Sequence, residues 1–185
     1  MEHIEYEERV MISKSDYKKI IADVKKEKRE LTHINIVNIY LDNDASFIYK
    51  TRKMLRIRYT NLGDVELTLK IRNKDNATRE INETLNEHPQ IDENLEGKFE
   101  DYHKVAELKT KRIEVQYDNY LLVIDQNDYH KIRDYDIEIE ADSQEKAKEL
   151  LSFYCKKYNL SYDPDYKSKS HRAIQRAREL KKTED

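Results

Sequence analysis

Apolar and polar side chains alternate with a period of two along much of this sequence. Such alternation is typical of a β-strand with one buried and one polar face. It is clearest in residues 54–59 and 65–72, where apolar residues share one face and Arg and Lys recur on the other. The pattern predicts eight strands, over residues 4–12, 34–41, 54–59, 65–72, 78–85, 108–117, 120–125 and 135–141. Turn residues such as Asn61-Leu62-Gly63-Asp64 favour antiparallel hairpins.

A second spacing, of three to four residues between apolar side chains, predicts helices. They are expected over residues 17–31, 91–105, 144–158 and 171–181. Ser15 and Ser143 stand just before two of them, where a hydroxyl can cap the first free amides. Gly97 should make the helix over 91–105 irregular.

These elements predict an α+β fold in which an eight-stranded antiparallel sheet closes into a barrel, with the helices packed outside. The helices would then cover the apolar strand faces, so that the charged faces line a tunnel. The 185 residues contain no long-period repeat and no linker, which indicates a single domain over 1–185 with a frayed C-terminal end.

The composition excludes some classes of function. Charged residues make up 39% of the chain, but 35 basic and 38 acidic residues nearly balance, which argues against a general nucleic-acid binder. No apolar run approaches the length of a membrane span. The single cysteine, Cys155, is expected to pack in the core, and the six histidines lack metal-ligand spacing. We therefore expect a cytoplasmic monomer or homodimer that binds neither nucleic acid nor membrane.

The charged strand faces carry the candidate chemistry. The strand over 54–59 places Arg56 and Arg58 on one face, and its neighbour adds Lys70 and Arg72. Carboxylates recur in the same way in the first and last strands: Glu5, Glu7, Glu138 and Glu140. Like charges facing each other across strands are destabilising, so these faces either lie in bulk water or meet ions of opposite charge. A tunnel lined by them would suit a polyanion, held by Arg and Lys, together with Mg²⁺ or Mn²⁺ held by carboxylates.

The opening segment Glu5-Tyr6-Glu7-Glu8-Arg9 resembles the ExExK signature that begins the CYTH, or triphosphate tunnel metalloenzyme, superfamily. Segments similar to the family's later motifs follow in the family's order: Tyr40-Leu41-Asp42, Leu55-Arg56-Ile57-Arg58, Leu67-Thr68-Leu69-Lys70-Ile71-Arg72, Glu80-Ile81-Asn82, Lys111-Arg112, Asp125, Glu138-Ile139-Glu140 and Ser168-Lys169-Ser170-His171-Arg172. The resemblance covers residues 3–178. It is greatest to bacterial single-domain members described as adenylate-cyclase-like or as triphosphatases.

The resemblance implies a closed eight-stranded tunnel in which a divalent-metal-dependent enzyme hydrolyses a triphosphate. Water would attack a terminal phosphorus of inorganic tripolyphosphate or a nucleoside triphosphate. By the family pattern, Glu5, Glu7, Glu138 and Glu140 hold Mg²⁺ or Mn²⁺ and act in catalysis together with Arg9. Phosphate oxygens would bind Arg9, Arg56, Arg58, Lys70, Arg72, Arg112, Lys169 and Arg172. Glu80, Asn82 and Asp125 would complete the tunnel wall. The later cations of the last helix, Arg176, Arg178, Lys181 and Lys182, are expected to be solvated.

The sequence departs from the family pattern at two places. Arg9 replaces the terminal Lys of the signature, which exchanges a compact ammonium for a forked guanidinium and favours a role in phosphate binding. The fifth strand offers Glu80 and Asn82 where many members have two acidic residues. Two alternatives stay open: a class IV-type adenylate cyclase, in which the ribose hydroxyl replaces water as nucleophile, and a non-catalytic polyphosphate or nucleotide sensor.

Overall fold

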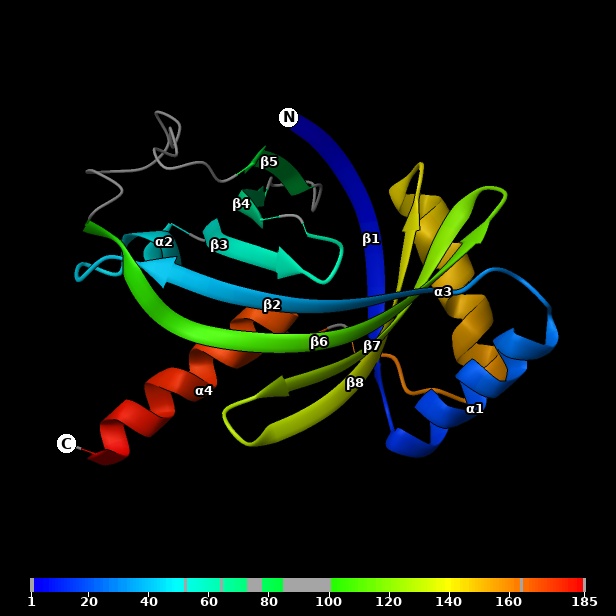
Figure 1. Cartoon of the computed structure of the whole chain (residues 1–185). Helices are drawn as coiled ribbons and strands as arrows, with labels where there is room; N and C mark the ends of the chain where they lie inside the picture. The colour runs from blue at the N-terminus through cyan, green and yellow to red at the C-terminus, as the bar shows by residue number, and fades with distance from the viewer. Residues whose placement is uncertain are drawn as a thin grey trace. The chain divides into compact units, whose positions relative to one another are not determined.

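The computed structural model describes residues 2–51, 53–63, 65–72, 78–84, 101–163 and 165–184, with the backbone alone described at 2–5, 72, 78–80, 83, 84 and 184. Eight strands and four helices lie within these residues (Figure 1). The strands are β1 (Glu2–Ile12), β2 (Thr32–Asp42), β3 (Lys53–Thr60), β4 (Val65–Arg72), β5 (Thr78–Thr84), β6 (His103–Tyr117), β7 (Tyr120–Tyr129) and β8 (Ile132–Ala141). The helices are α1 (Lys14–Lys26), α2 (Phe47–Lys50), α3 (Gln144–Tyr158) and α4 (Lys169–Glu184).

The chain divides into two compact units, each assembled from separate stretches of sequence. Unit 1 comprises residues 1–4, 36–109 and 168–185, and unit 2 comprises residues 5–35 and 110–167. Long β2 and β6 contribute to both units. The candidate residues therefore fall into two groups, one in each unit.

Unit 1 is built on an antiparallel sheet in the order β5-β4-β3-β2. Its apolar face buries the alternating residues that the sequence predicted, among them Leu55, Leu67 and Leu69. Ile48 of α2 packs into the same cluster. Burying a side chain of this size contributes about 2 kcal/mol, so the period-two pattern is the main reason that these segments form a sheet.

Unit 2 has the strand order β6-β7-β8-β1, and α1 and α3 pack side by side against it (Figure 1). The core between sheet and helices includes Ile124, Ile137 and Ile139 from the strands, with Ile20 from α1 and Leu151 from α3. Cys155 lies partly buried against this core. Because the helices cover this apolar face, the charged side chains of β1, β7 and β8 project from the opposite face.

The structure confirms the α+β class and the antiparallel strands, and it corrects several boundaries. Helix α1 is capped by Ser13, whose hydroxyl accepts the Asp16 amide at 3.1 Å, and it ends before Lys28, whose φ is +56°. The helix predicted over 17–31 was therefore placed too late. Helix α4 begins at Lys169 rather than at 171, because the Ser168 hydroxyl accepts an amide of its first turn.

Further corrections concern β6, β7 and α2. Residues 103–105 were predicted to be helical but begin β6, because Ala106 and Leu108 continue a buried period-two face; residues 91–100 of that predicted helix, and Leu85, lie outside the described residues. Strand β7 continues past Asp125 because Asn127 is buried and hydrogen-bonded on the same face. The sequence pattern does not predict α2. None of the described helices is long and apolar enough to cross a membrane.

Candidate functional site

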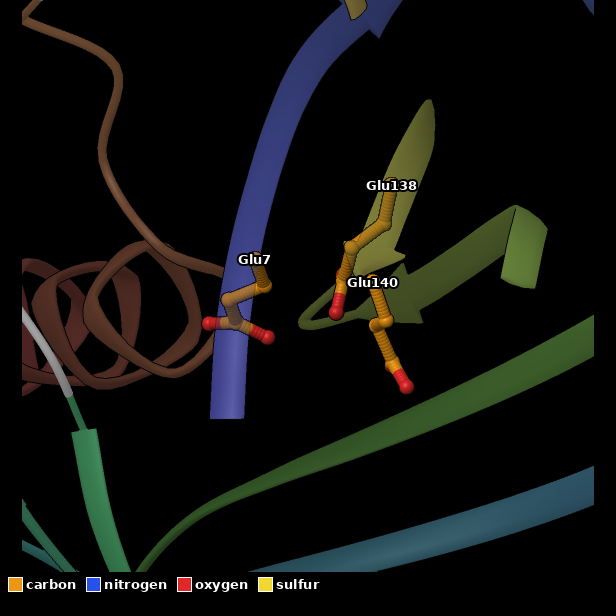
Figure 2. Close-up of side chains that lie close together, drawn as sticks. All are labelled: Glu7, Glu138 and Glu140. Atoms are coloured by element: carbon orange, nitrogen blue, oxygen red, sulfur yellow. The ribbon is translucent and has the colours of Figure 1, made fainter. Parts of the chain in front are cut away.

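Three carboxylates predicted to hold a metal converge on the charged face of unit 2. The antiparallel register of β1 and β8 places Glu7 opposite Glu140 and Arg9 opposite Glu138. Glu7, Glu138 and Glu140 point toward one another, and one carboxylate oxygen from each lies within 4.8 Å of the others (Figure 2). The convergence follows from strand parity, since residues two apart on β8 share a face with the facing residue of β1.

The register also brings like charges into direct opposition. Besides Glu7 and Glu140, it pairs Asp125 of β7 with Asp136 of β8. Asp125 and Asp136 are fully buried, and Glu138 is 3% exposed. Each directly opposed like-charged pair costs a few tenths of a kcal/mol to about 1 kcal/mol even on an exposed sheet, and burial increases the repulsion. The face is therefore stable only if cations or bound protons offset this repulsion.

One such cation is Arg9. Its Nη2 donates to Glu7, and its Nη1 lies 3.7 Å from the Glu138 carboxylate. Burial alone would lower the pKa of Arg9, but the charges of Glu138 and Glu7 raise the pKa above its ordinary value. Arg9, which stands where the ExExK signature has Lys, thus links Glu7 and Glu138, two of the three converging carboxylates.

A second cation is Arg112 of β6. It donates from Nε and Nη2 to both oxygens of Asp125, at 3.1 and 2.9 Å. Its Nη1 lies 3.6 Å from Glu114. Burial would lower the pKa of Arg112, and Asp125, followed by Glu138, raises it well above the usual range. Arg112, predicted to bind phosphate, therefore lies within the carboxylate cluster in this structure.

Asp136 belongs to this site although it was not among the site residues predicted from the sequence. Its Oδ2 accepts from Asn127 Nδ2 at 2.9 Å and from the Tyr166 hydroxyl at 3.1 Å. Asp125, Asp136 and Glu138 form a second group whose oxygens lie within 4.8 Å of one another. The signal was present in the sequence, since Asp136 shares strand parity with Glu138.

The residues present fit a divalent metal ion. Their donors are carboxylate oxygens, which suit hard cations such as Mg²⁺ or Mn²⁺ better than softer metals. Five carboxylates share this region with the guanidiniums of two arginines: Glu7, Asp125, Asp136, Glu138 and Glu140, with Arg9 and Arg112. When all are ionised, the negative charge exceeds the positive charge, and a bound divalent cation would reduce the difference.

The second group of candidate residues lies in unit 1 and is basic. Tyr40 of β2 is 2% exposed, and burial raises the pKa of its hydroxyl. Four cations act in the opposite direction on this hydroxyl: Arg56, Arg58, Lys169 and Lys70. Charged side chains from β3, β4 and α4 therefore act on one buried tyrosine, and Arg56 lies directly opposite it in the register of β2 and β3.

The register of unit 1 keeps these cations from facing one another directly. Arg56 lies opposite Thr68 and Arg58 opposite Glu66. Arg58 also donates from Nε to Asn38 on β2, at 3.2 Å. The alternation in the sequence predicted that cations oppose cations across β3 and β4, but in the register they are staggered.

The remaining predicted residues also fall in unit 1, apart from Glu5. Lys169 and Arg172 lie in the first turn of α4 and are partly buried. Asn82 of β5 lies opposite Thr68 and is partly buried. The side chains of Glu5, Arg72 and Glu80 are outside the described residues, so their predicted roles stay predictions.

Comparison with known proteins identifies the family. The CYTH domain model matches residues 3–170. No curated protein matches the sequence. A candidate adenylate cyclase from Bacillus halodurans has a similar structure, with 25% identity, a TM-score of 0.74 and coverage of 95% of this chain and 97% of the other.

Two further solved structures share the fold at lower identity. A candidate adenylyl cyclase from Hippeastrum with a dominant triphosphatase activity has 20% identity and a TM-score of 0.72, over 91% of this chain and 93% of the other. A candidate adenylate cyclase from Vibrio parahaemolyticus has 13% identity and a TM-score of 0.59, over 91% and 96%. The family model spans nearly the whole sequence and both charged faces, and the chain therefore belongs to the CYTH domain family.

Proposed function

We propose that this protein hydrolyses a triphosphate, either inorganic tripolyphosphate or a nucleoside triphosphate, with the help of Mg²⁺ or Mn²⁺. The observation that carries the proposal is the convergence of Glu7, Glu138 and Glu140 on a largely buried strand face of a CYTH domain. We further propose that the sheets of the two units join edge to edge as one closed barrel, whose lumen receives both charged faces.

The acidic face would hold the metal and organise the reacting water. Glu7, Glu138 and Glu140 would provide its oxygen ligands, and Asp125 would keep Arg112 in place beside them. A bound divalent ion supplies Lewis-acid polarisation of a phosphoryl oxygen and lowers the pKa of nearby water. Arg9, already in contact with Glu7, would stay close enough to stabilise negative charge on the transferred group.

The basic face would bind the phosphate chain. Arg56, Arg58, Lys70 and Lys169 all lower the pKa of the Tyr40 hydroxyl, so all four charges lie within electrostatic range of it. Guanidinium and ammonium groups form strong, short hydrogen bonds with phosphate oxygens. Because a triphosphate carries several negative charges along a short chain, it matches this cluster better than a monophosphate does.

The same fold is also compatible with an adenylate cyclase reaction, in which a ribose hydroxyl attacks phosphorus in place of water. The Hippeastrum protein has this fold and a dominant triphosphatase activity, so the fold accommodates hydrolysis. A cyclase would also require recognition of adenine. The groups that predominate in the two faces are carboxylates, guanidiniums and ammoniums, which suit metal and phosphate, and we therefore favour hydrolysis.

One assay set tests the proposal. Purified protein with Mg²⁺ or Mn²⁺ is offered tripolyphosphate, ATP, GTP and thiamine triphosphate, and phosphate, pyrophosphate and cyclic AMP are measured. We expect metal-dependent release of phosphate. Formation of cyclic AMP and pyrophosphate without phosphate would replace hydrolysis by cyclisation. Tight binding of tripolyphosphate without turnover would indicate that the protein is a non-catalytic polyphosphate or nucleotide sensor.

A further inference from the structure

Asp42, at the end of β2, is a fixed carboxylate outside the two charged clusters. Its Oδ1 accepts the Ile48 amide at 2.9 Å and its Oδ2 accepts the Tyr49 amide at 3.2 Å. Oδ1 also accepts the amide of Asn43 at 2.9 Å. Asp42 is 3% exposed. These bonds hold α2 against the end of β2 and fix the positions of both carboxylate oxygens.

Arg178 of α4 contacts this assembly in two ways. Its Nη2 lies 3.7 Å from Oδ2 of Asp42, and its guanidinium carbon lies 3.8 Å from the centre of the Tyr49 ring. A guanidinium stacked on an aromatic ring and paired with a buried carboxylate is held in one orientation. Arg178 was predicted to be solvated, but its side chain is two-thirds buried, with 33% exposed.

Helix geometry separates this contact from the phosphate-binding side of α4. His171 is seven residues before Arg178 and therefore on the same face, and its ring centre lies 6.5 Å from that of Tyr49. Lys169 is nine residues before Arg178, which places it about half a turn away around the helix axis. Lys169 acts instead on the Tyr40 hydroxyl. One side of α4 is thus attached to α2, and the other presents Lys169 toward the basic cluster.

We infer that Arg178 is a positioning residue: through Asp42 and Tyr49 it holds α4 so that Lys169 and Arg172 reach a bound triphosphate. The inference rests on the proposed function and adds to it a residue that touches neither substrate nor metal. Without this attachment, the first turn of α4 loses its fixed distance from β2 and β3. The two cations would then bind phosphate with less preorganisation, and affinity would fall.

The test measures binding of tripolyphosphate to the full chain in EDTA, by calorimetry, so that turnover plays no part. Arg178→Ala should raise Kd about tenfold, and Arg178→Lys, which keeps the charge without the planar stack, should raise it about threefold. Lys181→Ala removes one positive charge from an exposed position of the same helix and should leave Kd unchanged. A wild-type Kd in Arg178→Ala would overturn the inference.

A second comparison distinguishes positioning from general damage. In a chain that already carries Lys169→Ala and Arg172→Ala, adding Arg178→Ala should change Kd by less than twofold, because the groups that Arg178 positions are gone. A full tenfold loss in that background would contradict the inference. Hydrogen exchange of the α4 amides gives an independent readout, and Arg178→Ala should speed exchange there while β3 and β4 stay protected. If the wild-type chain binds no tripolyphosphate, the proposed function fails, and α4 exchange alone decides whether Arg178 holds the helix.

Discussion

The charged faces of unit 2 and unit 1 differ in how the strand register distributes like charges. In unit 2 the register places Glu7 opposite Glu140 and Asp125 opposite Asp136. In unit 1 it places Arg56 opposite Thr68, and no two of the described cations of β3 and β4 stand opposite each other. Opposed carboxylates repel each other unless a cation or a proton lies between them.

The two faces also differ in how tightly their charges are paired within the protein. Arg112 donates two hydrogen bonds to buried Asp125, whereas Arg58 donates from Nε to the neutral amide of Asn38. A two-point contact with a buried carboxylate fixes a guanidinium in place. The contact of Arg112 with Asp125 thus fixes part of the acidic face, as the proposed metal site would require. Under the proposed function, the long basic side chains of the other face would adjust to a larger anion.

The largest expected effect tests the rigidity of the acidic face. Asp125→Asn removes the charge paired with Arg112 and leaves a buried guanidinium with weaker partners. The free energy of unfolding in urea, measured in EDTA, should fall by about 3 kcal/mol, because the loss of the buried pair with Arg112 outweighs the relief of the repulsion between Asp125 and Asp136. Asn38→Ala, which removes the partner of Arg58 from the basic face, should cost about 1 kcal/mol or less. Equal losses of unfolding free energy in Asp125→Asn and Asn38→Ala would show that charges on the two faces are paired equally tightly.

The second prediction concerns metal binding, and β1 provides its own control. Glu7→Gln should weaken Mn²⁺ binding, measured by calorimetry, and metal-dependent turnover by about a hundredfold or more, because a metal–carboxylate interaction contributes several kcal/mol. Glu8→Gln changes the neighbouring carboxylate, which points to the other strand face and accepts from Gln144 and Tyr162. That variant should bind Mn²⁺ as the wild type does. Unchanged Mn²⁺ binding in Glu7→Gln would exclude Glu7 from the site.

Strand parity made much of the acidic site predictable from the sequence. Since side chains alternate strictly, the charged residues of β1 and β8 had to share faces, and the convergence of Glu7 with Glu138 and Glu140 needed only the pairing of the first and last strands. Asp136 was missed because the family motif begins at Glu138, although the same alternation includes Asp136. The contact of Arg9 with Glu7 and Glu138 depends on side-chain rotamers, which alternation does not determine.

The basic face was less predictable because it depends on register and on a helix. Alternation put Arg56 and Arg58 on one face, but only the register between β3 and β4 shows that they oppose Thr68 and Glu66. The contact between Arg178 and Tyr49 joins residues that lie 129 positions apart in the sequence. The four-residue α2 that carries Tyr49 is too short to show a helical period.

A third prediction separates phosphate binding from metal binding. Lys70→Ala should raise the Kd for tripolyphosphate in EDTA about tenfold, since one charge-assisted hydrogen bond contributes about 1.5 kcal/mol. Mn²⁺ binding measured without phosphate should be unchanged. Lys50→Ala removes an exposed charge from α2 and should alter neither constant. A loss of Mn²⁺ affinity in Lys70→Ala would mean that the basic cluster and the metal ligands depend on each other even without substrate.

The smallest expected effect comes from one conservative change made on both faces. Arg112→Lys keeps the charge but loses the two-point contact with Asp125, and should lower the free energy of unfolding by about 1.5 kcal/mol. Arg58→Lys loses the Nε contact with the neutral side chain of Asn38, and should lower it by about 0.5 kcal/mol. Both values come from urea unfolding in EDTA. If Arg58→Lys lowers the free energy of unfolding as much as Arg112→Lys does, the basic side chains are held as firmly as those of the acidic face. The proposal that the basic side chains adjust to a larger anion would then be wrong.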